Sequence, residues 1–269
     1  MGVVNVTPDS FSDGGMFHDP ARACERIDEL MEQGARLIDV GGESTRPRAT
    51  PVPADEQRKR TLVPIRHAAD RVAVVSIDTS DPEVARAALD AGARIVNDAS
   101  CLRSGDGLAR AAAAAGAWLI LMHARGPMTG GFSDAPEDAY GDVVADVWRE
   151  WHAAEQRAEG AGVPPDRILL DPGIGFNKSA RHSADLVRRL GELCDKGFRV
   201  VIGPSRKSFL AAEVKTDPSR RLGGTAAACI AAAANGACVL RVHDVIEVRQ
   251  ALAVARAVGL LSAAEVARA

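Results

Sequence analysis

Short apolar runs alternate with longer amphipathic stretches along the chain. Five times a helical pattern ends at a glycine and an apolar run follows closely, as in QGARLIDV, AGARIVND, AGAWLILM, KGFRVVIG and NGACVLRV. Glycine in that place is typical of a left-handed helix C-cap, and such apolar runs are typical of parallel strands buried between helices. Three more runs, VVNV at 3–6, VAVVSID at 72–78 and RILLD at 167–171, bring the predicted strands to eight.

Helical stretches separate the predicted strands, and a last one over 245–258 closes the pattern. Asp19-Pro20 and Asp81-Pro82 each place an N-cap residue before a first-turn proline, which marks a helix start. Strand–helix alternation repeated eight times is typical of the (β/α)8 TIM barrel, and we expect residues 1–269 to form one such domain. A doubly wound parallel sheet is the alternative that the same pattern allows.

Composition argues against several classes of protein. The net charge of −3 at pH 7 gives no basic field for nucleic acid or a membrane surface, and we expect neither as a partner. No apolar run approaches the roughly 20 residues that cross a bilayer, and the start MGVVNVTPDS lacks the pattern of a secretion signal. The five cysteines form no C-x-x-C pair, which is typical of reduced thiols, so we expect a cytoplasmic protein.

Every predicted strand leaves the core on a polar or charged side chain. In a (β/α)8 barrel these ends meet at one mouth, where active sites lie. An aspartate after a strand can also simply cap the next element, and Asp98 is explained equally well that way. Asp39 could anchor the loop that follows it, and His123 alone is more typical of a hydrogen-bonded histidine at the edge of the core. The strand-end residues are Asn5, Asp39, Asp78, Asn97, Asp98, His123, Asp171, Ser205, Lys207, Arg241 and His243.

Cationic and acidic residues are expected on opposite sides of this mouth. Lys207 and Ser208 stand where the seventh strand joins a helix predicted over SFLAAEV, and Arg206 adds a second cation. A helix N-terminus favours anions, and the loops after the last two strands are a usual anion site in these barrels. Arg241 and His243 complete the predicted anion site. The residues expected on the acidic side are Asp78 and Asp171.

Eight segments resemble, in order, the motifs of the dihydropteroate synthase family: NVTPDSFSDGG, IDVGGESTRP, SIDT, IVND, LMH, DPGIGF, SRKSFL and RVHDV. Each motif alone is weak, whereas eight in order over nearly the whole chain are very specific. The resemblance implies a (β/α)8 barrel, usually a homodimer. It also implies a transferase that joins two small molecules, 6-hydroxymethyl-7,8-dihydropterin diphosphate and p-aminobenzoate, and releases pyrophosphate in folate synthesis.

The resemblance also assigns residues to the pterin substrate. Asp171 would accept hydrogen bonds from the aminopyrimidinone edge of the ring, and Lys207 would meet the ring carbonyl and N5. Asn5 would bind Mg²⁺, an ion that readily binds substrate phosphates with few protein ligands. The implied pterin-binding residues are Asp78, Asn97, Met122, Asp171, Phe176, Lys207 and Arg241. The implied diphosphate-binding residues are Asn5, Arg241 and His243.

Two loops, 7–17 and 42–53, would close over p-aminobenzoate. Asp13 resembles the aspartate placed near the methylene cation that forms as diphosphate leaves. The implied catalytic residues are Asp13, Lys207, Arg241 and His243. The implied p-aminobenzoate-binding residues are Phe11, Thr45, Arg46, Pro47, Lys207 and Ser208. Because the barrel fixes strand ends but not loops, we expect a preformed pterin site and a p-aminobenzoate site that depends on loop closure.

Three positions depart from the family's pattern: Arg48 and Cys101 stand where glycine is usual, and Ser183 where asparagine is usual. An arginine adopts positive φ only at a cost, so the loop that carries Arg48 would close differently. Two other functions stay open. One is a pterin-binding paralogue that has lost turnover, and the other is a pterin-dependent methyltransferase domain, which would need neither the lysine of SRK nor a p-aminobenzoate pocket.

Overall fold

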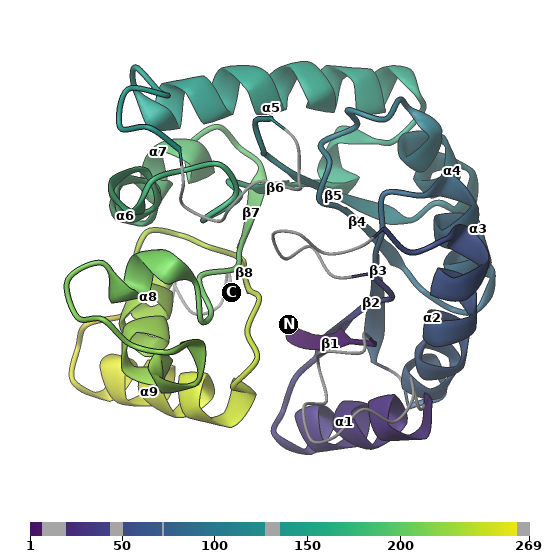
Figure 1. The fold of residues 1–269 in the computed structure, drawn as a ribbon, viewed down its shortest axis with the longest axis horizontal. Coiled ribbons are helices and arrows are strands. Elements are labelled where there is room, and N and C mark those ends of the chain that lie inside the picture. Colours follow the sequence, from purple (N-terminus) through teal and green to yellow (C-terminus); the bar gives the residue numbers. More distant parts are fainter. Residues whose placement is uncertain (7–19, 44–50, 72, 127–134, 263–269) are drawn as a thin grey trace.

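The computed structural model describes residues 1–6, 20–43, 51–71, 73–126 and 135–262. Eight parallel strands pair in chain order, and a bridge between Gly2 and Val242 joins the first strand to the segment after the last. Figure 1 shows this ring of strands with helices outside it, which confirms the predicted (β/α)8 barrel. The strands are β1 (Gly2–Asn5), β2 (Leu37–Gly41), β3 (Val74–Asp78), β4 (Ile95–Asp98), β5 (Trp118–Met122), β6 (Ile168–Asp171), β7 (Arg199–Ile202) and β8 (Val239–Leu240).

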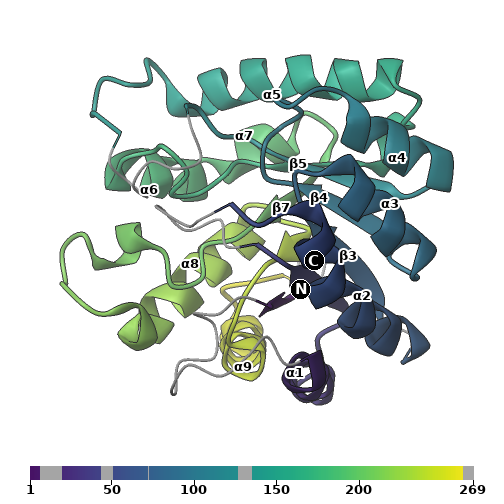
Figure 2. The ribbon, with the colours of Figure 1, turned by 45° about the vertical axis from the view of Figure 1, so that its right-hand side comes forward.

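Helices follow the strands and wrap the barrel, as Figure 2 shows from a second direction. The sixth predicted helix is divided in two. The helices are α1 (Pro20–Glu32), α2 (Ala54–Asp70), α3 (Pro82–Asp90), α4 (Gly107–Ala115), α5 (Val143–Gly160), α6 (Ala180–Arg188), α7 (Leu190–Cys194), α8 (Leu222–Ala234) and α9 (Val245–Ala257).

The predicted turn chemistry is present in the structure. Each of the five glycines that end a helical pattern has positive φ, between 60° and 114°: Gly34, Gly92, Gly116, Gly197 and Gly236. Asp81 caps α3, because its Oδ1 accepts from the backbone N–H groups of Glu83 at 2.7 Å and Val84 at 3.1 Å. These local signals fix where each helix ends and the next strand begins.

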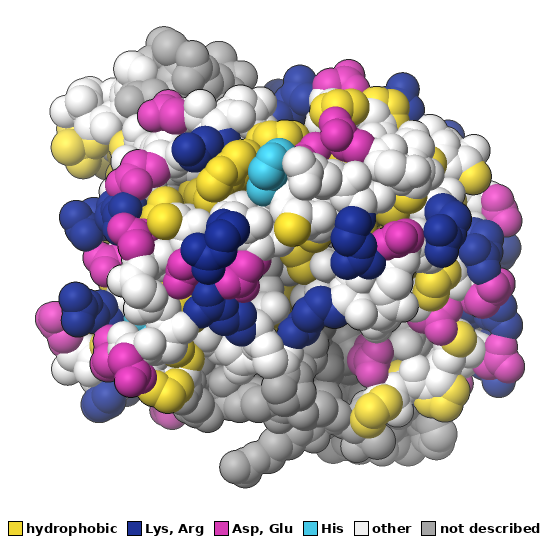
Figure 3. Space-filling model, turned by 90° about the horizontal axis from the view of Figure 1, so that it is seen from above, with side chains coloured by type: hydrophobic (Ala, Val, Ile, Leu, Met, Phe, Trp, Pro, Cys, Tyr) yellow, Lys and Arg dark blue, Asp and Glu magenta, His cyan; other side chains and the backbone are white. Residues whose placement is uncertain are grey.

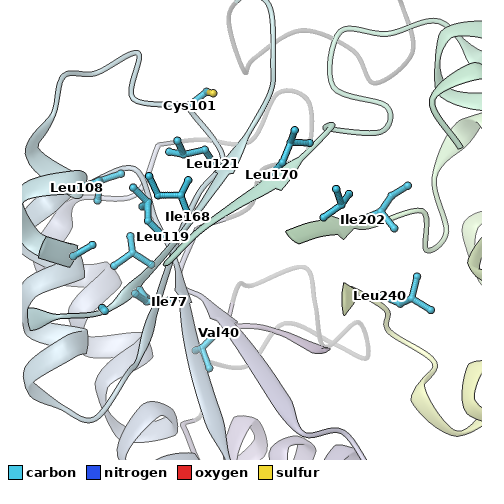
Figure 4. Close-up of a cluster of buried hydrophobic side chains, with 14 of the residues drawn as sticks. Val40, Ile77, Cys101, Leu108, Leu119, Leu121, Ile168, Leu170, Ile202 and Leu240 are labelled. Carbon is cyan, nitrogen blue, oxygen red and sulfur yellow. The ribbon is translucent and has the colours of Figure 1, made fainter. Parts of the chain in front are cut away.

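Alternate strand residues face two apolar layers. One layer lies between strands and helices, and Figure 4 shows part of it, including Leu119 and Leu121 of β5 and Ile168 and Leu170 of β6. Burial of each such apolar side chain contributes about 1.5–3 kcal/mol to the stability of the folded state. The second layer fills the lumen at the amino end of the strands, so a ligand would enter from the carboxyl end. Its residues are Ile95, Ile120, Leu169 and Val201, with Met1, Leu37, Trp118 and Val239 packed against them.

The prediction of a helix over SFLAAEV, residues 208–214, is wrong. Ser208–Ala211 forms a single 3-10 turn, closed by i→i+3 bonds such as Leu210 N to Lys207 O at 3.2 Å, and α8 begins only at Leu222. The sequence between them contains Asp217-Pro218, and a residue before proline disfavours the α conformation. A turn this short has little macrodipole, so the anion-binding argument from a helix N-terminus does not apply to Ser208.

The surface carries both signs of charge. Figure 3 shows basic and acidic side chains interspersed over the face it views, in keeping with the small net charge of −3. Among the described residues, none of the helices has the length and apolar character to cross a membrane.

Candidate active site

Four neighbouring strands place the mouth residues on one row. Asn5, Gly41, Asp78 and Asn97 pair successively in register across β1 to β4. Gly41 keeps this row open, because a Cβ there would lie 3.5 Å from Asn5 Oδ1 and 3.6 Å from Asp78 Cβ. Polar groups that are far apart in the sequence therefore meet at one level of the lumen.

An ion network lies at the floor of this mouth. Asp39 Oδ2 accepts from Arg241 Nε at 2.7 Å and from Asn97 Nδ2 at 3.2 Å. Arg241 Nη2 donates to Asp78 Oδ2 at 3.0 Å. Two carboxylates thus share one guanidinium, and burial, followed by the charge of Asp39, raises the pKa of Asp78 to about 7. We refer to Asp39, Asp78, Asn97 and Arg241 as the mouth network.

Asp171 ends β6 beside Met122, its register partner on β5. The Asp171 Oδ1 accepts from Gly173 N at 2.8 Å, and burial raises the pKa of this carboxyl. Gly173 has a φ of 69°, and a Cβ there would overlap the His123 carbonyl, so this turn requires glycine. The DPGIGF segment therefore holds Asp171 at the mouth with the turn folded back against β5.

All seven residues that the family resemblance assigned to the pterin line one narrow pocket at the mouth: Asp78, Asn97, Met122, Asp171, Phe176, Lys207 and Arg241. The free volume of this pocket is about 30 Å³. Lys207 Nζ lies over the Phe176 ring, 3.9 Å from its centroid. Burial, followed by the charge of Arg241, lowers the pKa of Lys207 to about 7. The polar edge of the pocket is in place, as a preformed site requires, whereas Lys207 fills part of the slot for the ring.

Two side-chain pairs join the loops after β7 and β8. Ser205 Oγ lies 3.0 Å from His243 Nδ1 and accepts from His243 N at 3.3 Å. Arg206 Nε donates to Asp244 Oδ2 at 3.0 Å. The ladder between these strands has only two residue pairs, so the side chains supplement a short sheet contact. Arg206 is therefore paired with a carboxylate, which corrects its assignment as an added cation of the mouth.

The backbone at Arg206 is in the left-handed region, with a φ of 60°. Thr225 Oγ1 accepts from its N–H at 3.1 Å, and Arg221 Nη1 donates to its carbonyl at 2.9 Å. These bonds stabilise a conformation that costs a non-glycine residue about 1 kcal/mol or more. The turn places Lys207 in the pocket.

Burial, followed by the charge of Arg241, lowers the pKa of His243 to about 3, so this imidazole is neutral near pH 7.

A second ion network lies behind the mouth, between β5 and α5. Lys178 is fully buried, and its Nζ contacts His123 Nδ1 at 3.0 Å and the carbonyls of His123 and Phe176, both at 3.2 Å. His123 Nε2 lies 3.0 Å from Glu150 Oε2, and Arg125 Nε donates to the same carboxylate at 3.0 Å. We refer to His123, Arg125, Glu150 and Lys178 as the outer network.

Two of the alternatives weighed from the sequence are supported. His123 is 1% exposed and hydrogen-bonded within the outer network, so it is a buried histidine that does not line the pocket. Asp98 accepts from Ser100 N at 2.7 Å and Leu102 N at 2.6 Å, so it caps the turn after β4. The third alternative, that Asp39 anchors the loop after its strand, is not supported. Among the described residues, the side chain of Asp39 makes its hydrogen bonds to Asn97 and Arg241 of the mouth network.

Two of the family departures have a structural explanation. Cys101 has a φ of 56°, a left-handed conformation that favours glycine, and burial raises the pKa of its thiol to about 12. Ser183 is fully buried, and its Oγ accepts from Gly175 N at 3.2 Å. Ser183 therefore supports the DPGIGF segment with a hydrogen bond.

Several assigned residues lie outside the described part of the chain: Phe11, Asp13, Thr45, Arg46, Pro47 and Arg48. Asn5, the implied Mg²⁺ ligand, is half-buried at the mouth with its Oδ1 over the open position of Gly41. Within the described ranges no group of three or more His, Cys, Asp or Glu side chains could hold a metal. A single amide oxygen with room beside it fits Mg²⁺ held mainly by substrate phosphates and water.

A larger cavity, about 620 Å³, lies at the opposite end of the barrel, against Leu37, Val239 and one side of α9. It contains none of the residues of the two ion networks. The chemistry-bearing groups lie at the carboxyl ends of the strands, where active sites of these barrels lie.

The fold and the mouth define the class, a TIM-barrel enzyme with a polar pocket at the strand ends, and residues 1–243 match the family model described as pterin binding enzyme. The dihydropteroate synthase of Escherichia coli (strain K12) is 42% identical over 259 residues, covering 96% of this chain and 90% of that protein. That of Mycobacterium leprae (strain TN) is 41% identical over 251 residues, with 91% and 88% covered. The chain belongs to the dihydropteroate synthase family.

Solved structures agree with this placement. The Xanthomonas albilineans dihydropteroate synthase with 4-aminobenzoic acid superposes with a TM-score of 0.88 at 41% identity, covering 97% of this chain and 93% of that one. The same enzyme in complex with 7,8-dihydropteroate gives 0.84 at 38% identity, with the same coverage. The Yersinia pestis enzyme in a sulfonamide drug complex gives 0.87 at 36% identity, with 96% and 92% covered.

Sequence reasoning misplaced one member of the two ion networks and missed another. Asp39 was placed at a strand end, whereas it is the third residue of β2 and faces the lumen. A charged residue inside an apolar strand was the available signal. Lys178 was not singled out at all, although it directly follows the DPGIGF motif and its neighbour, and a lysine is rarely buried without a partner.

Proposed function

We propose that this protein condenses 6-hydroxymethyl-7,8-dihydropterin diphosphate with p-aminobenzoate to form 7,8-dihydropteroate and pyrophosphate. The observation that carries the proposal is the convergence of Asp78, Asn97, Asp171, Lys207 and Arg241 on one pocket. Such a set offers carboxylate acceptors to the N–H donors of a pterin edge and cations to a diphosphate.

The pterin would bind through its aminopyrimidinone edge. Asp171 accepts from that edge, and Asn97 and Asp78 complete the hydrogen bonds on the neighbouring strands. Lys207 moves from the face of Phe176 to the ring carbonyl and N5, and the ring takes its place between Phe176 and Met122. Charge-assisted hydrogen bonds of this kind contribute about 1.5–3 kcal/mol each.

The reaction would be a substitution at the pterin methylene. The carbon–oxygen bond to diphosphate breaks, and the electron pair leaves with pyrophosphate while Arg241 and His243 stabilise its charge. The amine nitrogen of p-aminobenzoate forms the new carbon–nitrogen bond and then loses a proton to solvent. Asn5 would hold Mg²⁺, and the ion would supply positive charge that stabilises the leaving group. An aniline is already a neutral nucleophile, so no strong general base is required.

We place p-aminobenzoate beside Lys207 and Ser208, under the loops that carry Phe11, Thr45, Arg46 and Pro47, with Asp13 near the methylene. The Xanthomonas relative with 4-aminobenzoic acid supports this substrate, and the Yersinia relative in a sulfonamide drug complex supports sulfonamides as further ligands. Because the walls are on loops, p-aminobenzoate should bind well only when pterin, pyrophosphate and Mg²⁺ are present. Equal affinity for p-aminobenzoate with and without those ligands would contradict the loop gate.

We further propose a cytoplasmic homodimer. The family resemblance supports the dimer, and five free thiols support a reducing compartment. Sedimentation at micromolar concentration tests the oligomeric state, and a monomer would contradict it.

Release of pyrophosphate from the two substrates together is the deciding test. Turnover that requires both the pterin diphosphate and p-aminobenzoate supports the proposal. Pterin binding without pyrophosphate release would identify a non-catalytic paralogue. Methyl transfer from a methylated pterin to a corrinoid protein would instead identify the methyltransferase alternative.

A further inference from the structure

Asp39 occupies an unusual place in the barrel lumen. It lies on the inward side of β2, between Leu37 of the apolar lumen layer and Gly41 of the mouth row, and it is 0% exposed. Because Asp39 does not line the mouth pocket, its effect on a substrate would pass through other residues.

One oxygen of Asp39 binds two residues that do line the pocket. Asp39 Oδ2 accepts from Asn97 Nδ2 at 3.2 Å and from Arg241 Nε at 2.7 Å. Asn97 belongs to the pterin-binding side, on β4, and Arg241 reaches toward the diphosphate from the segment after β8. The Asp39 carboxylate therefore joins the two sides of the mouth, whose residues Asn97 and Arg241 are far apart in the sequence.

This arrangement is costly for the fold. Asp39 Oδ1 has no hydrogen-bond partner among the described residues, and neither has Ser76 Oγ on its register partner in β3. A buried polar atom without a partner destabilises the folded state, and such atoms in native proteins often mark functional positions. An apolar residue at this position would avoid the cost, but it would leave Asn97 and one edge of Arg241 without an acceptor.

We infer that Asp39 is a positioning residue, which fixes Asn97 and Arg241 together and so couples the pterin-binding and pyrophosphate-binding sides of the mouth. The inference rests on the proposed function, since it concerns the same site. Without Asp39, Arg241 would pair with Asp78 alone, and the Asn97 amide would be free to rotate away from the ring.

The test is calorimetric binding of 6-hydroxymethylpterin, and separately of pyrophosphate with Mg²⁺, to wild type and Asp39→Asn. Both affinities should fall by at least about tenfold, the effect of one lost charge-assisted hydrogen bond. The matched control is Asp98→Asn, which changes an equally buried carboxylate whose bonds stay within its own turn. It should lower thermal stability and leave both affinities within about threefold. Folded Asp39→Asn with unchanged affinities would overturn the inference, whereas a wild type that binds neither ligand would overturn the proposed function.

If Asp39→Asn alone fails to fold, a double variant provides a second test of the inference. Asp39→Asn combined with Arg241→Gln removes both charges, which avoids an unpaired buried ion. Relative to Arg241→Gln alone, the added substitution should leave pyrophosphate affinity unchanged but still weaken pterin binding through Asn97. An additional loss of pyrophosphate affinity would show that Asp39 does not act through Arg241.

The pH dependence of pterin binding gives a readout that a purely structural role would not move. Four groups act on the Asp78 carboxyl: Asp39 and Asp98 raise its pKa, and Arg241 and Lys207 lower it. Removing the Asp39 charge should therefore lower the pKa of Asp78, and the acidic limb of the binding profile should move to lower pH. An unmoved limb in folded Asp39→Asn would contradict the inference.

Discussion

The mouth network and the outer network are built from the same kinds of groups but do different work. Each contains a partly buried arginine that binds carboxylates, Arg241 with Asp39 and Asp78 in one and Arg125 with Glu150 in the other, and each also contains a fully buried ionisable side chain, Asp39 or Lys178. The mouth network lies against the pocket, and the outer network lies between β5 and α5. Buried charge by itself is therefore a poor marker of function.

The difference lies in which groups have spare capacity. In the outer network Lys178 meets three acceptors, and His123 is bonded at both ring nitrogens. In the mouth network an oxygen of Asp39 is unpartnered among the described residues, and the pKa of Asp78 is raised to about 7. Because Asp39 is fully buried and does not line the pocket, the groups of this network that can bind a ligand are Asp78, Asn97 and Arg241, which do line it.

The largest expected effect comes from Arg241→Gln. The variant should lose at least about a hundredfold in kcat/KM, because the proposed interaction with the leaving group and the ion pairs with Asp39 and Asp78 are both lost. Arg125→Gln in the outer network should stay within about threefold of wild type when folded. Steady-state kinetics with a thermal-unfolding control measure both, and equal losses would remove the distinction between the networks.

Acidification should destabilise the outer network through His123. Burial, followed by the charge of Lys178, lowers the pKa of His123 to about 4. This depressed pKa means that its contribution to stability is fully present above pH 6.5 and is lost as pH falls toward 4. The free energy of unfolding of wild type should therefore drop by about 3 kcal/mol more than that of His123→Gln over this range. Urea titrations at several pH values measure the difference, and parallel curves would refute the assignment.

The Asp78 carboxyl should contribute with the opposite sign. Its raised pKa gives stability that is fully present below 3.8 and is lost as pH rises through about 7. Comparison of Asp78→Asn with wild type isolates this contribution. The two networks would then be separable by the direction of their pH dependence as well as by ligand binding.

Lys178→Met should lower the free energy of unfolding by about 2 kcal/mol, because the carbonyls of His123 and Phe176 lose their common donor. Lys215→Met is the matched control on an exposed lysine and should change stability by less than about 0.5 kcal/mol. Pterin affinity of the folded Lys178 variant should fall less than that of Asp39→Asn. A larger fall would mean that the outer network also serves binding.

Asp171→Asn should reduce pterin affinity by about tenfold, since the carboxylate proposed to accept from two ring donors would become an amide with one acceptor and one donor. Calorimetry with a folded variant measures this loss. Unchanged pterin binding would remove Asp171 from the site.

The smallest expected effect is at the junction of the loops after β7 and β8. Ser205→Ala removes the hydroxyl that contacts His243 and should weaken pyrophosphate by about fivefold, the effect of one neutral hydrogen bond. His243→Ala should also weaken pyrophosphate more than free pterin. Equal loss of both ligands in either variant would mean that this junction is only structural.

The sequence was sufficient for the barrel because glycine C-caps and short apolar runs are local signals, and eight repeats reinforce one another. Strand order also predicted that the polar strand ends meet at one mouth, whereas the assignment of the pocket residues to a pterin came from the family resemblance and stays a prediction. Three assignments failed for tertiary reasons. Arg206 pairs with Asp244, 38 residues away, Asp39 turns into the lumen, and the helix-like pattern after Lys207 is interrupted before Pro218.

The position of Lys207 over Phe176 has a consequence for every affinity measured on this site. The ammonium lies over the aromatic face that the proposed pterin site requires, so in that site Lys207 would compete with the substrate. The apparent dissociation constant is then the intrinsic one divided by the fraction of molecules in which the lysine has swung aside. A flat compound that binds with Lys207 still over Phe176 would avoid this loss of affinity. An inhibitor designed only on the ligand-bound form would not avoid it.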